Sequence, residues 1–305
     1  MTATAVGALF IILLGAVARR TGLLRPKDGV AMVNIVLYFA MPCLVLREMV
    51  GATLDASLIL VPVAGYLVYG VLLGTAFAGS RLLRLDRPGT GALAVATAVG
   101  NTGFFGIPLI AASGSGLSVP AAIMYDTFCT TVLTWTSTVA LANLFGEGGS
   151  EDRRIEWGRL SRNFLLPPTW ALAIGLALNG MGVTELPAVI DRPLEIMAAA
   201  VLPLVLLYAG LMLDLGDVMR ARRPVGFATV ARLALGPVIG LGAALALGFS
   251  GDVMRTVVLM AAMPTAMMSL VIGGWYRLRT DVIAGAIVTT TVLCTLTLPV
   301  IKALL

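Results

Sequence analysis

Long apolar runs dominate this sequence and limit its possible folds more than any other feature. Ten such runs follow one another with short connections. About 20 apolar residues are needed to cross a bilayer as a helix. Only 12% of the residues are charged, roughly half the share in soluble domains. The pattern predicts an all-α polytopic membrane protein with ten spans, at about 2–18, 29–49, 57–79, 90–112, 118–143, 164–181, 194–213, 225–248, 253–275 and 282–304.

One connection, 146–163, is longer and more polar than the others and falls between the fifth and sixth spans. It divides the chain into two five-span units, 1–145 and 164–305. Most of the 21 Lys and Arg residues lie on the side of this loop, which predicts that this side is cytoplasmic. The other side holds Arg47, Arg192, Arg255 and Lys302. Both termini are therefore expected outside, and five spans per unit give the two units opposite topology, an inverted repeat.

Weak internal similarity agrees with a repeat. The second and seventh spans share a Pro-centred motif at 41–46 and 202–207. The third and eighth share Gly-x-x-x-Gly at 70–74 and 236–240. Such glycine pairs let membrane helices approach closely, so both pairs are expected to mediate tight packing.

The fourth and ninth spans are interrupted at matching places, 100–108 (GNTGFFGIP) and 261–266 (AAMPTA). A broken membrane helix leaves backbone groups unpaired, at several kcal/mol each in hydrocarbon. Paired breaks in two repeats point to a transporter's substrate site. We expect non-helical backbone at Asn101–Pro108 and at Pro264, with the two spans crossing near mid-membrane. The alternative is a pair of structural kinks satisfied by neighbouring helices.

At such a crossing, two half-helix N-termini would offer free N–H groups and partial positive charge to a carboxylate. The residues predicted to bind substrate come from the two breaks and from the second and seventh spans. They are Asn101, Thr102, Gly103, Pro108, Met263, Pro264, Thr265, Pro42 and Tyr208.

Two ionisable residues lie well inside spans, Asp126 in the fifth and Arg232 in the eighth. Each is about 12 Å from its end of the membrane at a rise of about 1.5 Å per residue, so they lie at similar depth. Intramembrane charges are functional by default. We expect these two to act as a charge pair, directly or through the substrate; a static pair that holds two helices together is the alternative.

At these positions the chain resembles the auxin efflux carrier family, which includes the plant PIN-type carriers and many bacterial permeases. The resemblance rests on Gly-Asn-Thr-Gly at 100–103, Gly-Ile-Pro-Leu at 106–109, Pro167-Pro168, and Met-Pro-Thr at 263–265 followed by Tyr276. It implies a bacterial inner-membrane homodimer built on scaffold spans 1, 2, 6 and 7. Spans 3–5 and 8–10 would form a moving domain that carries organic anions by an elevator mechanism.

The chain also departs from the plant members. These have Gln-Gly after the second crossing proline, where this chain has Thr265-Ala266, and their long hydrophilic loop is short here. A small carboxylate such as malate or malonate is therefore as plausible a substrate as auxin.

Other functions are less compatible with the residues. The chain has no histidine, which excludes His-ligated zinc and His-based catalysis, and we expect no metal, cofactor or nucleic acid. A Gly-Lys-Ser/Thr loop for ATP is absent. An anion channel and an intramembrane aspartyl protease using Asp126 and Asp217 remain as alternatives. Coupling to H⁺, to Na⁺ or to neither ion is left open.

Overall fold

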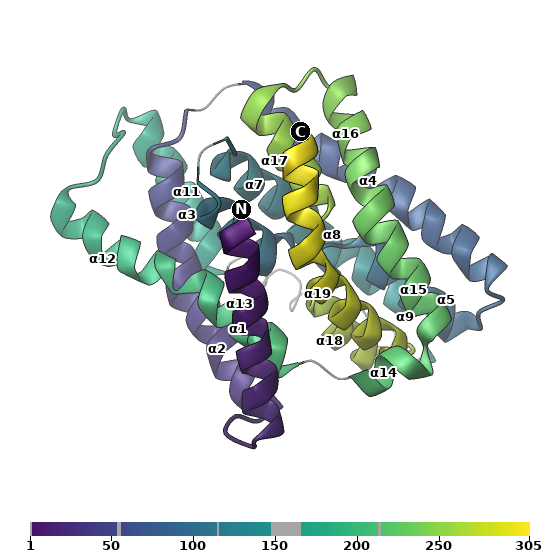
Figure 1. Ribbon diagram of the computed structural model, residues 1–305. Helices are drawn as coiled ribbons and strands as arrows, with labels where there is room; N and C mark the ends of the chain where they lie inside the picture. The colour runs from purple at the N-terminus through teal and green to yellow at the C-terminus, as the bar shows by residue number, and fades with distance from the viewer. Residues whose placement is uncertain (1, 54–55, 115, 148–165, 213–214) are drawn as a thin grey trace.

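The structure is a computed structural model that describes residues 2–53, 56–114, 116–147, 166–212 and 215–305, without the side chains of 2–6, 26, 56 and 215–217. Its regular elements within these ranges are helices (Figure 1). In chain order they are α1 (Thr2–Arg20), α2 (Gly29–Ile35), α3 (Met41–Val50), α4 (Ala56–Leu82), α5 (Arg87–Ala98), α6 (Ile107–Ala112), α7 (Val119–Tyr125), α8 (Thr131–Leu133), α9 (Val139–Phe145), α11 (Pro167–Gly180), α12 (Ala188–Ala199), α13 (Val201–Leu211), α14 (Leu215–Arg220), α15 (Arg222–Val230), α16 (Gly236–Ala246), α17 (Gly251–Ala261), α18 (Met268–Trp275) and α19 (Thr280–Leu304).

Short π-helical turns join several of these helices into longer ones. They lie at Val36–Ala40, Thr102–Gly106, Asp126–Thr130, Thr134–Thr138 and Ala231–Leu235. Such turns are rare in proteins and often mark functional sites.

Six helical stretches in the described part of the chain are long and apolar enough to cross a membrane. They are Gly29–Val50, Ser57–Leu82, Val119–Phe145, Ala188–Leu211, Arg222–Ala246 and Thr280–Leu304. They match six of the predicted spans and confirm a multi-pass membrane protein. The other four predicted spans are α1, α11 and the two interrupted ones, so the total of ten stays a prediction. Helix α14 was not predicted, and most of the 146–163 loop lies outside the described residues.

The helices associate in two groups. Helix α1 packs along α13, and α3 packs along α11, whereas α4 packs along α5 and α16 along α17. Figure 1 shows α1, α3, α11, α12 and α13 on one side of the molecule and α4, α5, α15 and α16 on the other. Close approach within the first group depends on Gly15 and Gly210, where an added Cβ would collide with backbone of the facing helix.

The two glycine pairs behave differently. An added Cβ at Gly236 would lie 2.6 Å from the carbonyl oxygen of Ala261, and Gly240 approaches the same residue, so close packing of α16 on α17 is confirmed. The prediction was wrong for Gly70 and Gly74, which have no heavy atom within 4 Å of an added Cβ. Both are on the exposed face of α4, and a motif alone does not show which face of a helix is packed.

Candidate functional site

The two sequence interruptions lie against each other. Gly100 and Thr265 form an isolated antiparallel bridge. The backbone N–H of Asn101 donates to the carbonyl oxygen of Pro264 at 2.7 Å, and that of Ala266 donates to Val99 at 3.1 Å. Backbone groups freed by one break are thus paired with those freed by the other, which lowers the cost of opening two membrane helices.

The first break is shorter than predicted. Backbone at Pro264 is non-helical as expected, but in the fourth span only residues 99–101 leave the helix. Thr102–Ala112 is helical and includes Pro108. The physical reason is the π-helical turn, in which the N–H of Ile107 reaches back to Thr102. Pro108 follows this turn directly, as the second residue of α6.

Side chains from other helices satisfy the end of α5. The last carbonyls of a helix have no intrahelical partner. Here Ser269 Oγ donates to the carbonyl of Val95 at 3.3 Å, and Thr265 Oγ1 donates to that of Ala96 at 2.8 Å. One residue within the second break and one after it therefore hold the first break in place.

A cavity of about 150 Å³ adjoins the breaks. It lies between the α2–α3 span, the first break, the α7–α9 span, the start of α11 and the start of α18. Its lining is Leu37, Met41, Val45, Gly100, Asn101, Thr102, Gly103, Phe104, Ile107, Asp126, Thr127, Thr130, Thr131, Thr134, Trp135, Leu166, Pro168, Thr169, Ala266, Met267 and Met268. Apolar walls thus surround a polar patch of threonines, one amide and one carboxyl group.

Asn101 is the notable polar group in this cavity. The residue is only 4% exposed, yet its Nδ2 has no hydrogen-bond partner in the part of the chain that the structure describes. An unpaired buried donor costs about 1–3 kcal/mol, so a bound acceptor would recover that free energy. Asn101 directly precedes the helical segment Thr102–Ala112 and borders the cavity.

Asp126 also borders the cavity and is held by hydroxyl groups. Thr102 Oγ1 donates to its Oδ1 at 2.6 Å, and Thr131 Oγ1 donates to its Oδ2 at 3.4 Å. An added Cβ at Gly103 would lie 3.0 Å from both carboxyl oxygens. The glycine therefore lets the carboxyl group sit against the start of the second half of the fourth span.

Arg232 occupies a different place and does not line the cavity. It is 2% exposed. Its Nε donates to the carbonyl oxygen of Met263 at 2.9 Å, and its Nη1 donates to those of Thr97 and Ala98, each at 3.1 Å. Its described hydrogen bonds include none to Asp126, and the electrostatic coupling of the two residues stays a prediction.

Comparison with known proteins identifies the family. The profile of a family described as membrane transport protein matches residues 2–151 and 153–302. The chain belongs to this family, the auxin efflux carrier family. A protein named "Uncharacterized transporter" from Methanothermobacter thermautotrophicus is 30% identical over 301 residues, covering 98% of this chain and 96% of that protein. Membership agrees with the prediction of a transporter rather than an enzyme.

Two other relatives carry more specific names. A "Putative malonate transporter" from Rhizobium meliloti is 29% identical over 281 residues, which are 88% of this chain and 85% of the relative. "Auxin efflux carrier component 1" from Arabidopsis thaliana is 28% identical over 139 residues, covering 43% of this chain but only 22% of the plant protein.

The structure of this family member brings only part of the predicted binding set to the cavity. Asn101, Thr102 and Gly103 line it. Pro108, Pro264 and Thr265 are buried within the broken spans instead, Met263 contributes its carbonyl to Arg232, and Pro42 and Tyr208 lie outside the lining. The side chain of Asp217, proposed as a protease partner of Asp126, lies outside the described residues.

Sequence reasoning missed the threonines of the fifth span. Thr127, Thr130, Thr131 and Thr134 all line the cavity. Their spacing of three, four and seven residues places them on one face of a helix. A polar face within an apolar span is the signal that could have identified them.

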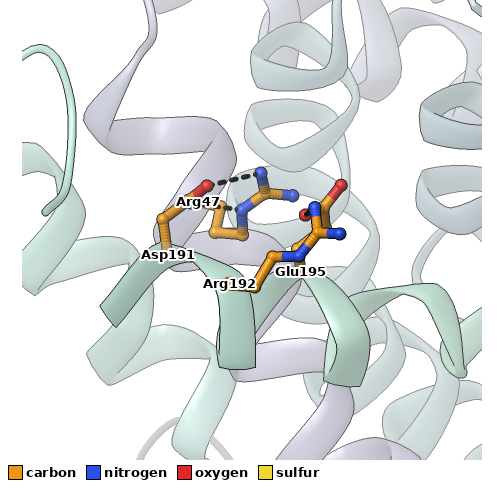
Figure 2. Close-up of polar contacts among 4 residues, drawn as sticks. All are labelled: Arg47, Asp191, Arg192 and Glu195. Carbon is orange, nitrogen blue, oxygen red and sulfur yellow. Dashed lines mark hydrogen bonds and ion pairs between the residues drawn. The ribbon is translucent and has the colours of Figure 1, made fainter. Parts of the chain in front are cut away.

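A larger cavity of about 690 Å³ lies at the other end of the bundle. The two cavities lie toward opposite ends of α11, because Pro168 lines the smaller one and Thr184 the larger one. Beside the larger cavity, Arg47 Nε and Nη2 donate to the two carboxyl oxygens of Asp191 at 2.5 and 3.0 Å. Figure 2 shows this pair between α3 and α12, with Arg192 paired to Glu195 nearby. The bidentate geometry ties the two helices together.

Proposed function

We propose that this protein is a secondary transporter for a small organic anion, and that the substrate carboxylate binds in the cavity beside the breaks. The observation that carries the proposal is the unpaired Nδ2 of Asn101, buried at the edge of that cavity. An amide donor without a partner is suited to an acceptor that arrives and leaves, because the protein itself does not satisfy it.

Helix ends add to the attraction for an anion. The helical segment Thr102–Ala112 starts at the cavity, and α18 starts there at Met268. The N-terminal end of a helix carries partial positive charge and favours anions. Together with the threonine hydroxyls, these ends supply donors on more than one side of a bound carboxylate.

The size of the cavity favours a small substrate. Sites for drug-sized ligands are typically about 300–1,000 Å³, whereas this one is about 150 Å³. A dicarboxylate of three or four carbons suits it better than an indole acid does. The relative named as a putative malonate transporter covers 88% of this chain and points the same way.

The positions of the two cavities favour an alternating-access mechanism. They share no lining residue and lie toward opposite ends of the bundle, an arrangement better suited to a carrier than to an open anion channel. In the proposed elevator, α1–α3 and α11–α13 form the scaffold. The two broken spans, which would cross as matching parts of two inverted repeats, belong to the moving group. The most extensive helix packing, α1 on α13, α3 on α11, α16 on α17 and α4 on α5, runs within these groups and supports this division.

The family resemblance also implies a homodimer formed through the scaffold. An exposed apolar stripe on α1 supports this part of the proposal. Phe10, Leu13 and Val17 are 61%, 53% and 54% exposed and recur at helical spacing. In the monomer this face meets lipid, and in the proposed dimer it would be available to a second copy.

A ligand screen with the purified protein tests the substrate class. Malonate and malate are expected to raise the thermal unfolding temperature of the protein. Indole-3-acetate should raise it less, and the neutral diamide of malonate should leave it unchanged. Proteoliposomes should then show saturable uptake of labelled malonate, accelerated by unlabelled malonate inside. Uptake that neither saturates nor exchanges would favour the channel, and no response to any carboxylate would contradict the proposed substrate class.

A further inference from the structure

Three main-chain carbonyl oxygens converge where the first halves of the broken spans end. α5 ends at Ala98, so the carbonyls of Thr97 and Ala98 have no partner within the helix. The carbonyl of Met263 follows the end of α17. Helix C-terminal ends carry partial negative charge. Two such ends therefore meet at the breaks, where both contact the side chain of Arg232.

Arg232 fills the space between these oxygens. Its Nε and Nη1 make all three contacts at 2.9–3.1 Å, and the side chain is 2% exposed. Its hydrogen bonds in the described part of the chain are to main-chain oxygens, without a carboxylate. The positive charge is therefore balanced by carbonyl dipoles, which is how proteins coordinate a dehydrated alkali cation inside a membrane.

Gly100 makes this position possible. An added Cβ at residue 100 would overlap the Nη2 of Arg232. The bridge between Gly100 and Thr265 holds the two broken strands of backbone around the guanidinium. The chain thus provides both the oxygen ligands and the space for one cation, and it occupies that space with its own side chain.

We infer that Arg232 is a built-in cation, which takes the position that a sodium ion would otherwise occupy between the carbonyls of Thr97, Ala98 and Met263. The protein then binds no sodium at the breaks. Transport of the anion therefore proceeds without a sodium gradient. This consequence for transport rests on the proposed function, whereas the absence of sodium binding at the breaks does not.

Removing the guanidinium should convert the site into one for an external cation. The test compares Arg232→Ala with wild type and with Arg223→Ala, which removes an exposed arginine. Thermal unfolding is measured in sodium chloride and in N-methyl-D-glucamine chloride at equal ionic strength, and with dilute guanidinium. Wild type and Arg223→Ala should unfold at the same temperature in both salts. Arg232→Ala should unfold several degrees lower in N-methyl-D-glucamine and regain part of this loss with sodium or guanidinium.

Several results would overturn the inference. One is a rise in the unfolding temperature of wild type that only sodium produces, and another is an Arg232→Ala protein as stable as wild type. The third is a destabilised Arg232→Ala protein whose unfolding temperature no cation restores, because a purely structural arginine would give that result. If Arg232→Ala does not fold, Arg232→Lys keeps a positive charge and should fold without responding to sodium. If both variants fail, the salt comparison on wild type alone decides.

Uptake by wild-type proteoliposomes gives an independent measure. Equal malonate uptake with sodium or N-methyl-D-glucamine outside supports the inference, and uptake that requires sodium contradicts it. If no carboxylate is taken up in either salt, the proposed function has failed, and the thermal measurement still decides whether Arg232 replaces sodium.

Discussion

The backbone N–H of Asn101 donates to the carbonyl oxygen of Pro264 at 2.7 Å, across 163 positions of sequence. This bond joins the two interruptions, and Nδ2 of Asn101, at the edge of the cavity, has no hydrogen-bond partner among the described residues. Positive helix ends and the free amide border the cavity, whereas the negative helix ends meet Arg232. The positive helix ends at the breaks thus stay available to an anion, whereas the negative ends are already neutralised by Arg232.

Asn101→Ala should weaken malonate binding by about 1–3 kcal/mol, or roughly 5- to 150-fold, because a buried acceptor loses its donor. The ligand-free protein should not lose stability, since Nδ2 of Asn101 has no hydrogen-bond partner among the described residues. Thr291→Val is the matched control, because Thr291 Oγ1 is also buried and unpaired but lies outside the cavity lining. Titration by thermal shift measures both; unchanged affinity in Asn101→Ala would remove this residue from the site.

Gly100→Ala should destabilise the protein by about 1–3 kcal/mol, because its methyl group would displace the guanidinium of Arg232. Gly74→Ala is the control on α4, where nothing lies within 4 Å of the added methyl group. It should leave the unfolding temperature unchanged or raise it slightly, since alanine favours helix. Equal changes in unfolding temperature for the two substitutions would show that contact with Arg232 does not restrict position 100 to glycine.

Asp126→Asn should tighten malonate binding at neutral pH by about tenfold or more, because it removes a negative charge beside the proposed carboxylate site. Asp126 is the one titratable side chain among the described residues lining the cavity. As pH falls and Asp126 is protonated, the malonate affinity of wild type should therefore approach that of Asp126→Asn. Measuring both proteins at each pH cancels the titration of malonate itself.

The exposed residue Asp252, which pairs with Arg255 at the larger cavity, provides the control for Asp126→Asn. Asp252→Asn removes a charge of the same sign and should leave the pH dependence of binding as in wild type. A pH profile that is identical in all three proteins would exclude Asp126 from the electrostatics of substrate binding.

A double-mutant cycle tests whether Asp126 and Arg232 act together. Coupled charges predict that Asp126→Asn combined with Arg232→Gln loses less transport than the two single losses added. The two side chains have different hydrogen-bond partners in the structure, so any coupling must act through space or through the substrate. Strictly additive losses in initial uptake rates would establish that they are independent.

Cross-linking tests the elevator. Met41 on α3 and Ile107 on α6 line the same cavity from the two helix groups. A cysteine pair at these positions, in a background without Cys43, Cys129 and Cys294, should stop transport when cross-linked because the groups can no longer move relative to each other. A pair between α3 and α11, within one group, should leave transport intact when cross-linked. Full uptake through the Met41–Ile107 link would contradict relative motion of the groups.

Local composition was sufficient to predict much of this protein. Apolar length identified the six long spans, and the Gly and Pro residues located both interruptions, because a membrane helix depends on properties of consecutive residues. Even here the extent of a break was not predictable from the motif. The π-helical turn at Thr102–Gly106 keeps Pro108 helical, and the stability of this turn depends on the helices that surround it.

Tertiary packing decided the chemistry of the site. Asp126 and Arg232 have similar depths by sequence, yet Asp126 contacts hydroxyl groups at the cavity and Arg232 contacts carbonyl groups at the end of α5. The difference depends on which faces of the spans meet, as at Gly103 and Gly100, where the absence of a Cβ admits each charged group. Hydropathy records depth along the membrane normal, whereas direction around a helix becomes defined only when the other helices pack against it.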